Sequence, residues 1–166
     1  MKLRFRHLAF GTTGLTFGLI LLGVYTGAMG AGLACAGRWP LCDGAVFGLF
    51  PANWPSFIEW FHRFVAMITG FAILGTTVAA WRGDHERRIR YASAVALAVL
   101  PVQVLLGANT IFNFGVIAQV AHHAAALTIL VALVAATAWG FEEPGVGTAS
   151  RSDADATVET GARADD

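Results

Sequence analysis

Charged residues are scarce in this sequence. They make up 13% of the chain, while hydrophobic residues make up 56% and the mean hydropathy is +0.61. An ordinary globular domain carries about 25% charged residues. This composition excludes a disordered chain, and an apolar body offers phosphates no basic stripe, so we expect no nucleic-acid partner. Two cysteines are too few for a soluble disulfide scaffold. The composition is typical of a protein whose partner is the lipid membrane.

The net charge of zero conceals a segregation of sign along the chain. From Glu142 to the C-terminus there are seven acidic and two basic residues, a net charge of −5, so the preceding residues carry +5. Residues 144–166 are small, polar and acidic, which predicts a disordered cytoplasmic tail. We expect residues 1–143 to form one transmembrane domain.

Four apolar stretches are long enough to cross a membrane, which takes about 20 residues each. The segment from Tyr91 to Phe141 contains no Asp, Glu, Lys or Arg, but it is too long for one crossing, and Asn109, Asn113 and Gly115 indicate a break. The predicted fold class is therefore an all-α integral membrane protein, a bundle of four transmembrane helices. The expected spans are 8–29, 57–80, 91–110 and 116–140.

The basic residues predict the orientation of these helices. Lys and Arg gather beside the cytoplasmic ends of membrane helices. Here they precede the first span and separate the second from the third, two places that four spans put on the same side: Lys2, Arg4, Arg6, Arg82, Arg87, Arg88 and Arg90. We therefore expect a multi-pass protein of a prokaryotic cell membrane, with both termini cytoplasmic and the loop 30–56 outside.

Ionisable groups inside spans are costly to bury and are functional candidates by default. Glu59 lies three residues before His62 and four before Arg63, so the three share adjoining parts of one helical face. They form either a local Glu59–Arg63 ion pair with a hydrogen-bonded histidine, or part of a site. His122 lies six residues into the fourth span, the depth expected of His62 in the second. Two imidazoles at matched depth on different helices suit a bis-histidine haem in a helix bundle.

A weak internal repeat helps to choose between the adjacent His122 and His123, which point about 100° apart on a helix. Leu22-Gly23-Val24-Tyr25-Thr26 is similar to Leu106-Gly107-Ala108-Asn109-Thr110, and His62-x-x-x-Ala66 matches His122-x-x-x-Ala126. The repeat favours His122 as the partner of His62. His123 remains the alternative, or faces a neighbouring helix or subunit.

Cys35 and Cys42, the only cysteines, lie in the loop expected outside the membrane, where disulfides persist. They either staple this loop or exchange electrons. As a metal site they are weak candidates, because no further cysteine or loop histidine completes four ligands.

Two motifs together resemble the N-terminal half of the haem A synthases. One is the Cys-x6-Cys loop from Cys35 to Cys42, which contains Trp39-Pro40-Leu41, and the other is Glu59-x-x-His62-Arg63 on a membrane helix. The resemblance implies oxidation of the ring methyl of haem O to the formyl of haem A during cytochrome oxidase assembly. It implies haem iron ligation by His62 and His122, with haem b as cofactor, haem O as substrate, or both.

The resemblance also implies roles for the remaining site residues. Glu59 becomes the catalytic residue that assists proton movement or stabilises charge at the reacting centre, and Cys35 and Cys42 become a disulfide or an electron relay. Independently of the resemblance, guanidinium geometry makes Arg63 or Arg38 an expected partner of haem propionates. Haem A synthases usually have eight helices in two related halves, whereas this chain has one half, so we expect a homodimer. A haem O synthase and an electron acceptor are further expected partners.

Two other functions remain open. One is a b-type haem electron carrier or oxidase assembly factor without catalysis, although a carrier has no obvious need for Glu59 beside its ligand. The other is a quinone-linked thiol oxidase, which suits four helices and an external cysteine pair. Such an oxidase usually needs a second cysteine pair, which the sequence lacks, and it leaves the histidines unexplained.

Overall fold

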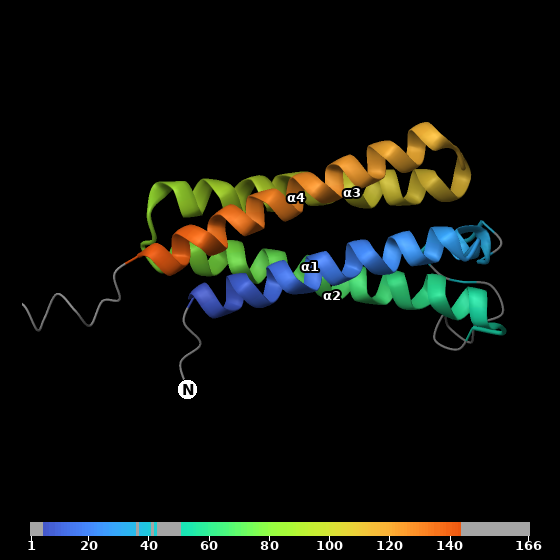
Figure 1. Cartoon of the computed structure of the whole chain (residues 1–166), viewed down its shortest axis with the longest axis horizontal. Coiled ribbons are helices and arrows are strands. Elements are labelled where there is room, and N and C mark those ends of the chain that lie inside the picture. The colour runs from blue at the N-terminus through green and yellow to red at the C-terminus, as the bar shows by residue number, and fades with distance from the viewer. Residues whose placement is uncertain (1–4, 36, 41, 43–50, 144–166) are drawn as a thin grey trace, which may run out of the picture.

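A computed structural model of the chain describes residues 5–35, 37–40, 42 and 51–143. Four long helices and one short 3-10 helix make up the fold (Figure 1). Their bounds are α1 Phe5–Ala28, η1 Ala31–Leu33, α2 Trp54–Arg82, α3 Arg87–Phe112 and α4 Val116–Glu142. All four long helices are apolar and long enough to span a membrane. The predicted all-α, four-helix membrane bundle is therefore confirmed.

The helix ends differ from the predicted ones by a few residues, because the helices continue into polar residues beyond the apolar spans and a capping side chain fixes the start of α2. Asn53 accepts a hydrogen bond from the Ser56 backbone N–H at 2.9 Å, and Pro55 stands in the first turn, so α2 begins at Trp54. Asn109, predicted to mark a break, lies inside α3, where its carbonyl accepts the N–H of Asn113. The turn to α4 is confined to residues 113–115. The tail 144–166 lies outside the described residues.

The helices form two pairs that lie along each other. Figure 1 shows α1 beside α2 and α3 beside α4, and contacts of α1 with α4 and of α2 with α3 join the pairs. Both pairs run the full length of the bundle. The chain therefore has two similar halves packed face to face, as its internal repeat suggests.

One half of the bundle is tightly packed, and small side chains are the reason. At the end where α4 finishes, Ala9, Ala80 and Ala136 are completely buried between helices together with Phe5 and Ile89. A second cluster follows toward the middle, around Ile73 and Leu133. Alanine lets membrane helices approach closely. The bundle is therefore closed at this end.

Threonine hydroxyls connect the helices within the same half. Thr12 of α1 bonds Thr76 of α2 at 2.8 Å, and Thr13 of α1 bonds Thr137 of α4 at 2.9 Å. Thr77 of α2 donates to the carbonyl of Ser93 of α3 at 3.0 Å. Hydroxyls suit membrane interfaces because they also bond their own helix backbone. These bonds link all four helices within the tightly packed half of the bundle.

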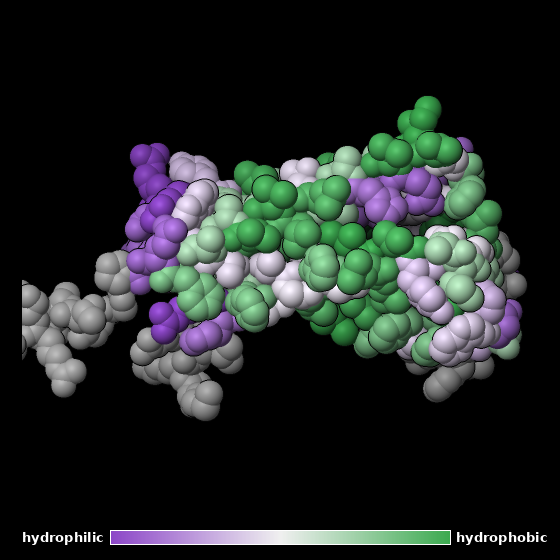
Figure 2. Space-filling model, viewed as in Figure 1, coloured by the Kyte–Doolittle hydropathy of each residue, from purple (hydrophilic) through white to green (hydrophobic). Residues whose placement is uncertain are grey.

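The surface follows the polarity of a membrane protein. Figure 2 shows a hydrophobic band across the long helices and hydrophilic residues gathered where α4 ends and α2 turns into α3. The described basic residues of this end include Arg82, Arg88 and Arg90, and Arg88 lies over the ring of Trp139 at 5.4 Å. Aromatic and basic side chains are typical of a membrane interface.

Candidate functional site

The open half of the bundle encloses a cavity of about 580 Å³ to which all four helices contribute. Its walls are mainly apolar, and the polar side chains among them include residues that the sequence singled out, two glutamines and four threonines. These polar lining residues include Glu59, His62, Arg63, Gln103, Gln119, His122 and His123. The volume lies in the range of small-molecule and cofactor sites, about 300–1,000 Å³.

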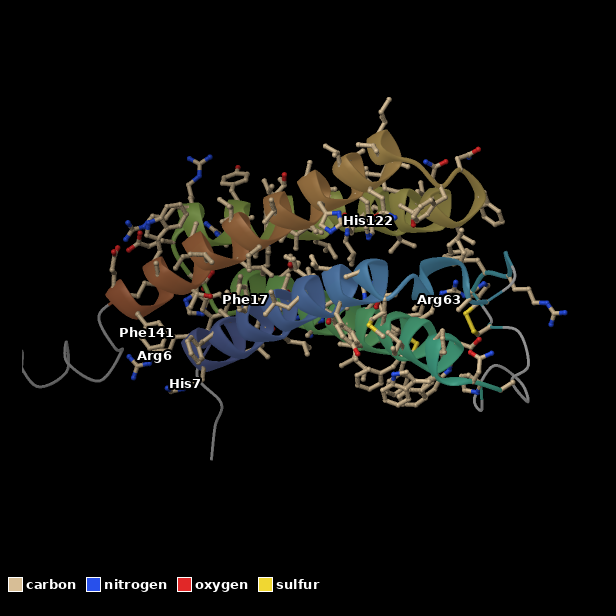
Figure 3. The ribbon with its side chains drawn as sticks, turned by 45° about the vertical axis from the view of Figure 1, so that its right-hand side comes forward. Arg6, His7, Phe17, Arg63, His122 and Phe141 are labelled. Atoms are coloured by element: carbon tan, nitrogen blue, oxygen red, sulfur yellow. A yellow bond between two sulfur atoms is a disulfide. The ribbon has the colours of Figure 1, made fainter. Side chains whose placement is uncertain are left out.

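Histidines from two helices reach this cavity, His62 from α2 and His122 from α4. Figure 3 shows His122 on the side of α4 that faces the other helix pair. His62 lies eight residues after the first residue of α2, and His122 lies six residues after the first residue of α4. The sequence predicted equal distances from the two helix starts, so this prediction was wrong by two residues. The cavity nevertheless brings the two side chains to one place.

A glycine on the preceding helix makes room for each of these rings. A Cβ added to Gly23 of α1 would lie 3.0 Å from Cε1 of His62, and one added to Gly107 of α3 would lie 3.0 Å from Cε1 of His122. Both glycines belong to the sequence repeat. The two halves of the molecule thus repeat one local contact between a glycine and a histidine.

Both histidines have a ring nitrogen that is buried without a partner. Nδ1 of His62 and Nδ1 of His122 make no hydrogen bond to the part of the chain that the structure describes. A buried polar atom without a partner costs about 1–3 kcal/mol. In a neutral imidazole one nitrogen is a donor and the other an acceptor, so the hydrogen bonding of each ring is incomplete within the described structure.

His123 also lines the cavity, although the repeat predicts His122 alone. Its Nδ1 bonds the backbone carbonyl of Gln119 at 2.7 Å, and its ring meets that of His122 edge to face at 6.0 Å between centroids. A histidine held by its own helix in this way has only Nε2 left for another partner. His123 is thus adjacent to the site with one ring nitrogen already engaged.

Glu59 and Arg63 form an ion pair on the wall of the cavity. Arg63 Nε donates to Glu59 Oε1 at 2.9 Å, and Glu59 is 6% exposed. Arg63 Nη1 also donates to the carbonyls of Arg38 at 2.8 Å and Pro40 at 3.2 Å. The local ion pair considered from the sequence is therefore present, and it is part of the cavity wall.

The cysteine loop is fastened at this same end of the cavity. Cys35 and Cys42 form a disulfide with their Cα atoms 4.4 Å apart, and both residues are buried. Cys42 Sγ lies 3.4 Å from the Ser56 carbonyl, and Trp39 and Pro40 line the cavity. Figure 3 shows Arg63 beside this loop. The described part of the loop thus covers the end of the cavity that holds Glu59.

Two glutamines of the cavity were not singled out from the sequence. Gln103 Nε2 donates to Nε2 of His122 at 3.3 Å, and Gln119 lines the cavity one turn before His123. The available signal was an amide side chain within a long segment without charged residues. Among the described residues no cluster of three or more His, Cys, Asp or Glu side chains is arranged for a metal ion. Two axial histidines suffice for haem iron.

Comparisons with known proteins place the chain in a family. Residues 50–134, about half of the chain, match the family model COX15-CtaA, described as cytochrome oxidase assembly protein. This range contains Glu59, His62, Arg63 and His122. No solved structure matches the chain.

Several curated proteins are similar to most of the chain. A haem A synthase of Bacillus licheniformis is 30% identical over 115 residues, which are 68% of this chain and 37% of that protein. A haem A synthase of Alkalihalophilus pseudofirmus is 31% identical over 127 residues, 75% of this chain and 42% of that protein.

Other similar proteins carry a different name. A protohaem IX farnesyltransferase of Halobacterium salinarum is 39% identical over 124 residues, 74% of this chain and 27% of that protein. The chain thus spans between about a quarter and two fifths of the length of these relatives. With the family match and the haem A synthase relatives together, the chain belongs to the COX15-CtaA family of cytochrome oxidase assembly proteins, the family of the haem A synthases.

Proposed function

We propose that this chain is a haem-binding unit of a haem A synthase, which oxidises the ring methyl of haem O to the formyl of haem A. The observation that carries the proposal is the pair of histidines: His62 and His122 come from different helices to one cavity, and each has a buried ring nitrogen without a partner among the described residues. Family membership supports haem as the group that occupies the cavity.

The residues of the cavity fit a haem. His62 and His122 would hold the iron, and apolar side chains such as Ile20, Ile111 and Ile129 would surround the macrocycle. When bound, haem supplies the electron-transfer chemistry, with haem b as cofactor, haem O as substrate, or both. Arg63 lies on the wall of the cavity, where its guanidinium would also be near haem propionates.

Glu59 is the residue we assign to proton movement. Converting a methyl to a formyl group replaces two C–H bonds by one C=O bond whose oxygen would come from water, and the overall step releases four protons and four electrons. Glu59 lies on the cavity wall, where its carboxylate would accept released protons. Arg63 holds that carboxylate by the 2.9 Å bond and would keep it oriented toward the cavity. The electrons would pass to an acceptor outside the chain.

The orientation in the membrane follows from charge. Arg6, Arg82, Arg87, Arg88 and Arg90 lie near the ends of helices that share one end of the bundle. Positive residues favour the cytoplasmic side. We infer that both termini are cytoplasmic, that the membrane is a prokaryotic cell membrane, and that the Cys35–Cys42 loop is outside.

We propose that the chain acts with partners. The haem A synthases compared above are more than twice as long as the segments that match, and a homodimer would bring together eight helices of this kind. Similar segments also occur in proteins named protohaem IX farnesyltransferase. An enzyme of that kind, a haem O synthase, is the second partner we propose, because its product would be the substrate here.

A haem carrier or oxidase assembly factor is the second candidate function. It is favoured by the two histidines, His62 and His122, that line one cavity, because two histidines suffice to bind haem iron. A carrier would bind haem through His62 and His122 without oxidising it. Glu59 separates the two functions, since electron transfer alone does not require a carboxylate at the haem.

Coexpression with a haem O source tests the proposal. The haems extracted from membranes are analysed by mass spectrometry, and the purified protein is analysed by optical spectroscopy. We expect a Soret band, and hydroxylated or formyl haem that is absent without this chain. A folded, haem-loaded protein without converted haem would identify the carrier. Absence of any Soret band under ample haem would reject both functions. Cross-linking in membranes would test the homodimer.

A further inference from the structure

The side chain of Gln103 forms a hydrogen bond with His122, one of the two histidines of the site. Gln103 is on α3, four residues before Gly107, so both residues face the ring of His122. Its Nε2 donates to His122 Nε2 at 3.3 Å, while its Oε1 is buried and has no partner in the described ranges. An amide is thus held inside the cavity with its single described side-chain hydrogen bond going to a candidate ligand.

The other histidine has no such partner. The repeat that relates Gly107 to Gly23 relates Gln103 to Leu19, an apolar side chain that also lines the cavity. Within the described residues no hydrogen bond reaches the ring of His62, and of its two nitrogens only Nδ1 is fully enclosed. The two halves therefore contain similar histidines with different hydrogen bonding. His122 accepts a hydrogen bond from Gln103, whereas the ring of His62 has no hydrogen-bond partner among the described residues.

A metal ion binds an imidazole through the lone pair of a ring nitrogen. At His122 that lone pair on Nε2 already accepts the Gln103 amide hydrogen, so iron and amide compete for one atom. A neutral hydrogen bond of this kind changes an equilibrium by about 2- to 10-fold. Among the residues that the structure describes, no hydrogen bond competes for a ring nitrogen of His62.

We propose that Gln103 makes His122 the exchangeable ligand of the haem, with His62 as the permanent one. This inference rests on the proposed haem site. Gln103 is a positioning residue that acts through His122: while it bonds Nε2, that nitrogen would be unavailable to the iron, and His62 alone would hold the haem. A small ligand would then have access to the iron from the His122 side.

Carbon monoxide binding to the reduced, haem-loaded protein tests the proposal. Gln103→Leu places in α3 the residue found at the equivalent position of α1. We expect the ratio of open to His122-ligated haem to fall about 2- to 10-fold in this variant. Gln119→Leu is the matched control, because it removes another amide of the same cavity that does not bond His122 Nε2. The control should bind carbon monoxide as the unchanged protein does.

The two ligand variants should differ in a defined way. We expect His122→Ala to keep its haem and bind carbon monoxide fully, and His62→Ala to lose most of its haem. Loss of haem from both variants alike would overturn the assignment of an exchangeable and a permanent ligand. Unchanged or increased carbon monoxide binding in Gln103→Leu would overturn the role of Gln103.

A measurement without haem separates this inference from the proposed function. In the haem-free protein, the side-chain ¹⁵N resonance of His122 Nε2 should shift in both Gln103→Leu and Gln103→Ala and remain in place in Gln119→Leu. An unmoved resonance would reject the hydrogen bond. Failure of the unchanged protein to take up haem would reject the proposed function and the inference together. If the protein takes up haem but Gln103→Leu leaves carbon monoxide binding unchanged, the inference alone is rejected.

Discussion

The ring of His62 lies so close to Gly23 that a methyl group on Gly23 would be 3.0 Å from its Cε1. Nearly all side-chain contacts of a Cβ are longer than this, so the ring would have to move. The ring of His122 lies against Gly107 at the same distance. Each histidine of the site thus packs against a glycine of the preceding helix.

Gly23→Ala and Gly107→Ala should therefore displace the histidines. We expect reduced haem content, and a free energy of unfolding lowered by about 1–3 kcal/mol because the contact is overpacked. Haem content and thermal stability measure the two effects. Gly18→Ala is the control, since nothing lies within 4 Å of its added Cβ. Equal haem content in all three variants would show that the ring positions tolerate this shift.

Glu59→Gln should separate haem binding from conversion. The amide keeps the size of the side chain but cannot take up a proton as a carboxylate does, so we expect haem content within about 2-fold of the unchanged protein and conversion reduced about 100-fold or more. Extracted haems and the optical spectrum provide the two measurements. If formyl haem accumulates normally in Glu59→Gln, Glu59 has no part in the reaction.

Replacing Cys35 and Cys42 together by serine should lower stability by about 2–4 kcal/mol, because the disulfide limits the unfolded loop. Thermal unfolding in detergent gives the effect. Conversion of haem measured in the same variant then decides between the two roles of the cysteines. Conversion that persists in the folded protein identifies a structural disulfide, whereas its loss at retained haem content identifies an electron relay.

Thr12→Val should weaken the contact between α1 and α2. The variant removes the 2.8 Å bond to Thr76, and interhelical bonds of this kind contribute about 0.6 kcal/mol on average in membranes. A double-mutant cycle with Thr76→Val measures the coupling. Thr128→Val is the control, because Thr128 is exposed and its hydroxyl bonds only the Ala124 carbonyl of its own helix in the described structure. Zero coupling would mean that the hydroxyls act separately.

Glu143 should make stability depend on pH at the C-terminal end of α4. Burial raises the pKa of its carboxyl, but hydrogen bonds from the Glu86 backbone N–H and the His85 ring outweigh burial and lower it. A pKa below that of the unfolded chain means that the stabilisation is present above the unfolded value and lost as pH falls through the folded value.

Glu143→Gln should accordingly flatten the loss of thermal stability on acidification, by about 0.2–1 kcal/mol as is typical of exposed ion pairs. Melting temperatures over a series from neutral to acidic pH give the comparison. Glu142→Gln is the control, since the Glu142 carboxylate is largely exposed and lies 3.3 Å from Arg88. Parallel pH profiles for the unchanged protein and Glu143→Gln would contradict the expectation.

Much of the site could be predicted from the sequence because its residues stand out chemically. The ionisable side chains of this site lie in apolar helices: Glu59, His62, Arg63 and His122. Placing such groups inside a membrane costs free energy, so they are functional candidates by default. Gln103 was missed because a neutral amide is cheaper to bury. Its importance depends on which histidine it faces, and that depends on the rotation of α3 against α4.

The sequence by itself determined the four membrane helices, since an apolar segment in lipid must satisfy its backbone hydrogen bonds internally and is therefore helical. It also determined which side chains are chemically unusual. Only the tertiary structure decided that Gly23 and Gly107 each seat a histidine, that Arg63 joins Glu59 to the cysteine loop, and that Gln103 bonds His122. These relationships join residues on different helices, and the packing of the helices decides which side chains meet.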